Sequence, residues 1–106
     1  MSKMLRRYEP LLPLRFNDGR MVPDDLLADA LLELEARFGA VSCETQTIRG
    51  QWRHQGKSYR DDLIRLFVDV SDDPGHRAFF LDFKARMMER FRQVDLGMTT
   101  YLIEVL

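Results

Sequence analysis

The side chains that could carry out acid–base, nucleophilic or metal chemistry in this sequence are few and widely spaced. They include two histidines, His54 and His76, and one cysteine, Cys43. His54 could exchange a proton near neutral pH, with Asp61 or Asp62 close by along the chain. Cys43 would react as a nucleophile only as a thiolate. No spacing among these residues matches a catalytic or metal-binding motif, so we expect neither a cofactor nor a metal.

A structural role is the stronger expectation for each of them. His54 precedes a Gln-Gly pair typical of a turn, where a histidine is solvated. His76 falls in the first turn of an expected helix, and the Asp72-Asp73 pair before it is typical of helix capping. We expect Cys43 to face the core as a small apolar group. A metal site would need these distant residues to converge.

The overall composition is that of one small globular domain, residues 1–106. Sixteen Lys and Arg against seventeen Asp and Glu leave a net charge of −1, which does not favour nucleic acid or an anionic membrane. The single cysteine excludes an internal disulfide, and no apolar run is long enough to cross a bilayer. The first residues lack the apolar segment of a signal peptide, so the expected location is the cytoplasm.

Two segments have helical periodicity. Apolar residues from Leu27 to Phe38 share one face, and the segment 23–38 begins with a proline and two aspartates and ends at a glycine. The second helix is expected over 74–92, with an apolar face formed by phenylalanines and Met87. The first helix is acidic and the second is rich in arginine, so we expect the two to attract each other side by side.

The remaining segments are expected to be extended. The first strand spans 8–16, with a bulge or a late start near residue 11 because Pro10 and Pro13 cannot donate to a ladder. Residues 40–69 contain two strands joined at Gln55-Gly56, and 96–106 supplies the last strand. The order strand, helix, strand, strand, helix, strand predicts an α+β, ferredoxin-like (split βαβ) fold, in which two helices cover one face of a four-stranded antiparallel sheet.

A two-residue turn at Gln55-Gly56 sets the register of the central hairpin. It pairs Trp52 with Tyr59 and Ile48 with Leu63, cross-strand contacts each worth roughly 0.2–1 kcal/mol over alanine pairs. It also pairs Arg49 with Asp62. The core face would carry Val41, Cys43, Thr45, Thr47, Ile64, Leu66, Val68 and Val70.

The opposite face would then expose a large apolar patch. Its residues are Ile48, Trp52, Tyr59, Leu63 and Phe67, which Leu11 and Leu102 could join. Such a patch is typical of a protein interface or a ligand groove. We expect a homodimer built through it, with Trp52 as anchor. The alternatives are a groove for a small apolar ligand, or a Trp52 that only packs on its own hairpin.

The hairpin also has basic residues: Arg49, Arg53, Lys57, Arg60 and Arg65. Beside Trp52 and Tyr59 they suggest the base-stacking surface of some RNA-binding domains. The signature motif of those domains is absent, and Glu9, Glu44 and Glu104, expected on the same face, would repel phosphate. The sequence therefore disfavours nucleic acid as a partner.

The segment Arg49-Gly50-Gln51-Trp52-Arg53, after a helix that ends in Phe38-Gly39, resembles small bacterial families classed as domains of unknown function. The resemblance implies a ferredoxin-like fold and no established activity. Two functions stay open. One is a homo-oligomeric interaction or small-ligand-binding module. The other is a small cofactor-independent enzyme, similar to dimeric α+β barrel monooxygenases or isomerases, in which His54, Tyr59 or Tyr101 would point into an apolar pocket.

Overall fold

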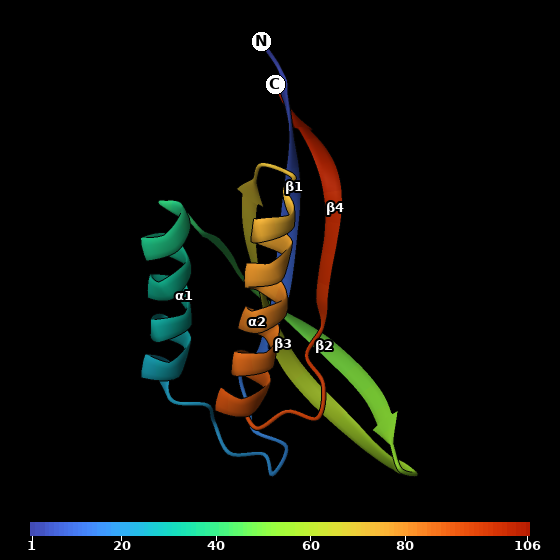
Figure 1. The fold of residues 1–106 in the computed structure, drawn as a ribbon. Coiled ribbons are helices and arrows are strands. Elements are labelled where there is room, and N and C mark those ends of the chain that lie inside the picture. Colours follow the sequence, from blue (N-terminus) through green and yellow to red (C-terminus); the bar gives the residue numbers. More distant parts are fainter.

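An antiparallel sheet covered on one face by two helices forms the architecture, and the computed structural model describes all residues 1–106 (Figure 1). The elements in chain order are β1 (Lys3–Pro13), α1 (Asp24–Phe38), β2 (Ser42–His54), β3 (Lys57–Val70), α2 (Pro74–Arg90) and β4 (Met98–Val105). The strands lie in the order β2-β3-β1-β4. The predicted ferredoxin-like fold is confirmed. Neither helix is long and apolar enough to span a membrane.

The helices begin and end at local signals in the sequence. Gly39 ends α1 in the left-handed conformation, with φ of 82°, and its N–H donates to the Glu35 carbonyl. At the start of α2 the Asp73 carboxylate accepts the backbone N–H of His76, the capping expected for this pair. The second helix ends two residues earlier than predicted, because Arg92 adopts a positive φ of 54°.

The core lies between the helices and the middle of the sheet. Alternate residues of β3, Ile64 to Val70, are buried, as predicted for the helix-covered face. Phe80 and Phe83 of α2 and Leu34 of α1 are fully buried above them. The Tyr8 ring of β1 stacks on Phe80 with a centroid distance of 4.2 Å. Burial of these apolar side chains helps to hold the helices to the sheet.

The predicted hairpin register is confirmed from the turn to Ile48. Trp52 faces Tyr59 and Ile48 faces Leu63. Beyond Ile48 an irregularity shifts the register, so that Glu44 faces Arg65 and Cys43 faces Leu66. Cys43 is exposed, which contradicts the expectation that it faces the core. The reason is that β2 is an edge strand, which the two helices do not reach.

Two expectations for β1 and β4 are also wrong. The first strand begins at Lys3, and its register with β3 is the same at Tyr8 and at Leu11, so there is no bulge at Pro10. In the ladder with β4, Leu102 faces Arg6 and Glu104 faces Met4. These residues share the helix side of the sheet with Tyr8, so neither Leu102 nor Glu104 lies on the open face.

Candidate functional site

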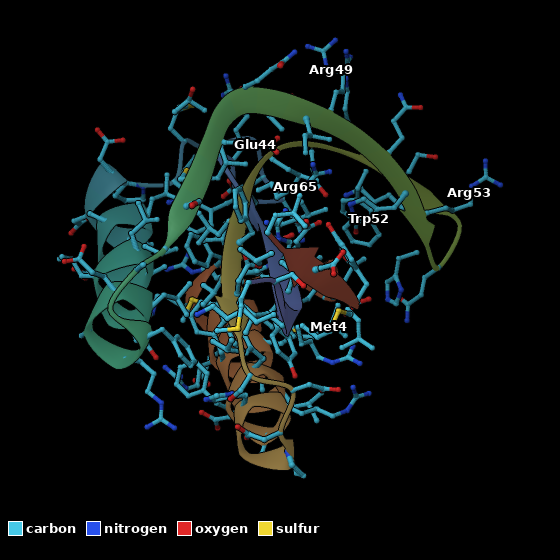
Figure 2. The ribbon with its side chains drawn as sticks, turned by 90° about the horizontal axis from the view of Figure 1, so that it is seen from above. Met4, Glu44, Arg49, Trp52, Arg53 and Arg65 are labelled. Carbon is cyan, nitrogen blue, oxygen red and sulfur yellow. The ribbon has the colours of Figure 1, made fainter.

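The five patch residues, Ile48, Trp52, Tyr59, Leu63 and Phe67, lie on the sheet face that the helices leave open, and all are half-buried. The rings of Trp52 and Tyr59 stack with centroids 4.4 Å apart. Figure 2 shows β2 arching over this face, with Trp52 beneath the arch. Part of the expected patch is therefore covered by the curvature of its own hairpin.

Charged side chains from β1 and β3 interrupt the patch. The Arg7 guanidinium donates to both carboxylate oxygens of Asp69, at 2.8 and 3.0 Å, and lies 4.4 Å from the centre of the Phe67 ring. Arg65 lies 3.7 Å from Glu9 and 3.4 Å from Glu44. Arg65 and its ion pairs with Glu9 and Glu44 thus lie between Phe67 and Trp52. The hairpin register alone could not predict these ion pairs, because they also depend on how β1 pairs with β3.

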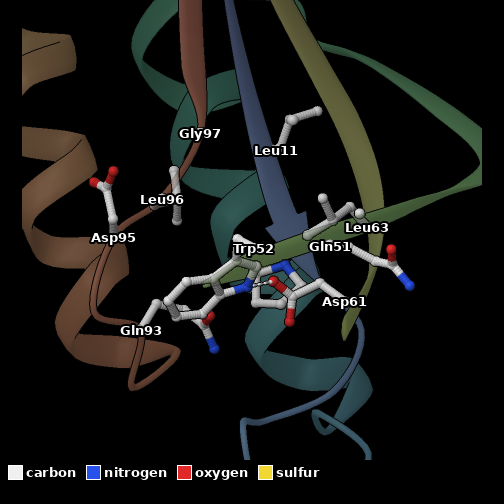
Figure 3. Close-up of a pocket in the computed structure, with 11 residues that line it drawn as sticks. Leu11, Gln51, Trp52, Asp61, Leu63, Gln93, Asp95, Leu96 and Gly97 are labelled. Carbon is white, nitrogen blue, oxygen red and sulfur yellow. Dashed lines mark hydrogen bonds between the residues drawn. The ribbon is translucent and has the colours of Figure 1, made fainter. Parts of the chain in front are cut away.

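Below the arch, the open face contains a pocket of about 290 Å³. It lies between the outer half of the β2–β3 hairpin, the end of β1 and the loop from α2 to β4 (Figure 3). Its lining residues are Leu11, Pro13, Gly50, Gln51, Trp52, Asp61, Leu63, Gln93, Asp95, Leu96 and Gly97. Three predicted residues, Trp52, Leu63 and Leu11, therefore meet here. Ile48, Tyr59 and Phe67 do not line this pocket.

A hydrogen bond holds the tryptophan in the pocket wall. The Trp52 indole N–H donates to the Asp61 carboxylate, as the dashed line in Figure 3 marks. Asp61 faces Gly50 across the hairpin and is the diagonal neighbour of Trp52. On sequence grounds Asp61 was expected as an acid–base partner of His54, and not as an acceptor for the Trp52 indole. The signal that identifies it is the register itself, since a partly buried indole N–H needs an acceptor on its own face.

Two glycines shape the pocket in different ways. A Cβ atom on Gly50 would lie 3.4 Å from the Leu63 Cδ1 atom, an ordinary contact, and Gly50 has no positive φ. Larger side chains at Gly50 would point into the pocket between Ile48 and Trp52. A Cβ on Gly97 would lie only 3.2 Å from Leu11 Cδ1, and the Gly97 carbonyl accepts the Leu11 N–H at 2.8 Å. The loop after α2 is thereby held tightly against β1.

The pocket is acidic. Its titratable lining residues are Asp61 and Asp95, and no lysine, arginine or histidine lines it. The pKa of Asp95 is lowered by the hydrogen bond that its carboxylate accepts from the Leu96 backbone N–H and by the Lys84 ammonium, 3.2 Å away. Asp61 already accepts the Trp52 N–H and Asp95 is paired with Lys84, and the remaining acceptor capacity of the two carboxylates favours a ligand with hydrogen-bond donors or a positive charge.

The acid–base candidates from the sequence lie elsewhere. Tyr59 lines an adjoining, more open hollow over the outer hairpin, which shares Gln51 and Trp52 with the pocket and also contains Arg53 and Arg60. The Tyr101 hydroxyl donates to the Glu9 carboxylate at 2.6 Å, which raises the pKa of this tyrosine. His54 lies at the hairpin end, its ring 6.4 Å from that of Trp52. Partial burial raises the pKa of Cys43, which disfavours the thiolate.

The chain matches no protein-family model and no curated protein. It does match the solved structure of a phage SAM lyase in complex with S-methyl-5'-thioadenosine, with a TM-score of 0.65. The alignment has 10% sequence identity and covers 95% of this chain and 88% of the lyase chain. At this identity the similarity concerns the fold, and it supports the ferredoxin-like assignment.

Proposed function

We propose that this chain is a small-ligand-binding module and that the ligand occupies the pocket beside Trp52. The observation that carries the proposal is the tryptophan held in the pocket wall by Asp61. Apolar walls with a few convergent polar groups are typical of ligand sites, and about 290 Å³ suits a small molecule. The hydrogen bond orients the indole before a ligand arrives, which lowers the entropic cost of binding.

The lining chemistry favours a ligand with a flat ring and a cationic group. An indole ring binds planar rings by stacking and cations through its face, and two carboxylates with no basic lining residue disfavour anions. S-adenosylmethionine combines an adenine ring with a sulfonium cation. The structural similarity to a SAM lyase bound to S-methyl-5'-thioadenosine supports nucleoside thioethers and sulfonium compounds as the first ligands to test.

Trp52 is the only tryptophan, so its fluorescence reports on the pocket directly. We expect S-adenosylmethionine to change the emission with a saturable dose dependence. S-adenosylhomocysteine, which lacks the sulfonium charge, should bind about tenfold more weakly, and ATP should not bind. If neither S-adenosylmethionine nor S-methyl-5'-thioadenosine binds at about 1 mM, this ligand class is wrong.

A matched pair of variants tests the location. Gly50→Val should narrow the pocket beside Leu63 and Trp52 and abolish the fluorescence response, while circular dichroism remains that of the wild type. Thr47→Val, on the same strand but exposed and outside the pocket, is the control. Equal ligand affinity of both variants would exclude the pocket as the binding site.

The open-face homodimer is a second candidate, because Ile48, Tyr59 and Leu63 lie on a face that no helix covers. Such a dimer predicts that Trp52→Ala weakens association by roughly thirtyfold in sedimentation experiments, whereas the binding function predicts no change. For the enzyme alternative, Asp61 and Asp95 are the pocket groups able to accept a proton, and Asp61 is the one without a lysine partner. A bound ligand would be incubated with wild type or with Asp61→Asn and then analysed by chromatography. Product formed by wild type and not by Asp61→Asn would reveal turnover.

A further inference from the structure

Exposed apolar side chains gather along the free edge of β4. This strand pairs only with β1, so its outer edge has no partner in the chain (Figure 1). Leu102 is 51% exposed, and Leu81 of α2, which shares a groove with Thr100 of β4, is 59% exposed. We define the β4 edge patch as Met4, Leu81, Leu102 and Leu106, which are exposed large hydrophobic residues, and Tyr101 is exposed on the opposite face of the same strand. Figure 2 shows Met4 beside this strand.

The two free edges of the sheet differ in protection. At the β2 edge the exposed residues 45–47 are polar, arginines follow, and the register shift between Glu44 and Ile48 breaks the regular ladder. These features prevent pairing with another chain. The β4 strand contains no proline, lysine, arginine or bulge, and its only charge is Glu104. Its backbone is therefore free to pair with an added strand.

We propose that β4 pairs antiparallel with β4 of a second copy of this chain, about a two-fold axis at Leu102. The two copies would form one continuous sheet with all helices on the same side. In this register Leu102 faces itself, Tyr101 faces Ile103 of the second copy, and Met98 faces Leu106. Each pair joins apolar side chains on one face, which antiparallel pairing stabilises. A two-fold axis also forms a closed dimer, so a fibre does not form.

Charge complementarity supports the second copy as the partner. Arg77 lines the groove between α2 and β4 together with Thr100, and it makes no ion pair within the chain. Glu104 also makes no ion pair within the chain. The proposed register places Glu104 of the second copy opposite Thr100, beside Arg77. The two-fold axis repeats this ion pair, so that both unpaired charges find a partner twice in each dimer.

Sedimentation velocity from about 1 to about 100 µM tests association, and we expect wild type to be a dimer at the upper end. Leu102→Lys places two ammonium groups opposite each other at the axis and should weaken the dimer about a hundredfold. Thr47→Lys adds the same charge to the β2 edge and should leave association unchanged. A monomeric wild type at about 100 µM, or a Leu102→Lys variant that associates like wild type, would overturn the proposal.

Two further measurements test the register. Arg77→Glu and Glu104→Arg should each weaken the dimer about tenfold, and the double variant should restore it. In a Cys43→Ser background, Leu102→Cys should form an intermolecular disulfide under mild oxidation, whereas Thr47→Cys should not. The dimer is independent of the ligand pocket, so the Leu102→Lys monomer should keep the Trp52 fluorescence response if the ligand proposal is right. If Trp52→Ala weakens association and Leu102→Lys does not, the interface lies on the open face and not at the β4 edge.

Discussion

Reversal of the charge at Glu33 should destabilise the contact between the two helices. Glu33 of α1 forms an ion pair with Arg86 of α2 and lies 3.8 Å from Arg90. The expected attraction between an acidic and an arginine-rich helix is thereby confirmed, and it is concentrated on one carboxylate. The Glu33 side chain is 27% exposed and the two arginines 37% and 31%, so solvent screens these pairs only in part.

The magnitude follows from this partial exposure. Two such pairs stabilise by about 0.5 kcal/mol each, and Glu33→Lys replaces them with repulsion, for a total loss of about 1–2 kcal/mol. For a domain of this length the melting temperature should fall by about 4–8 °C at low salt. In about 0.5 M salt roughly half of the loss should disappear, since screening weakens both the lost attraction and the new repulsion.

Thermal unfolding followed by circular dichroism at about 20 mM and about 500 mM salt measures both effects. Glu35→Lys is the matched control, because Glu35 lies on the same helix, is exposed and makes no ion pair. A lysine in the last turn also interacts favourably with the helix dipole, so this control should not lose stability. An equal loss for Glu33→Lys at both salt concentrations would refute the electrostatic account and point to a packing defect.

Two further changes test the helix ends. Gly39→Ala should cost about 1 kcal/mol in chemical denaturation, because a Cβ there meets no atom within 4 Å and the whole cost comes from the positive φ. The His76 backbone N–H lowers the pKa of Asp73, so this cap stabilises the fold above the unfolded-state pKa and is lost as the pH falls through the lower folded-state value. Asp73→Ala should therefore destabilise the protein at pH 7, with a difference from wild type that shrinks below about pH 4 in pH-dependent thermal melts.

Local rules account for the features that the sequence predicted correctly. The caps at Gly39 and Asp73 depend on backbone groups within four residues, and the register of Trp52 with Tyr59 follows from a two-residue turn. The order of elements then favours one topology, because antiparallel hairpins and short connections allow few arrangements. The fold class and the open face of the hairpin were therefore accessible from the residues alone.

Tertiary structure decided the exposure of Cys43 and the location of the pocket. Cys43 has the alternation of a core residue, but its strand lies at the sheet edge beyond the reach of the helices. The pocket joins Trp52 to the loop at Asp95 and to Leu11, which are distant along the chain and meet only through strand order and hairpin curvature. Periodicity determines which side of a strand a residue occupies. What lies opposite that side depends on long-range packing, which no local pattern encodes.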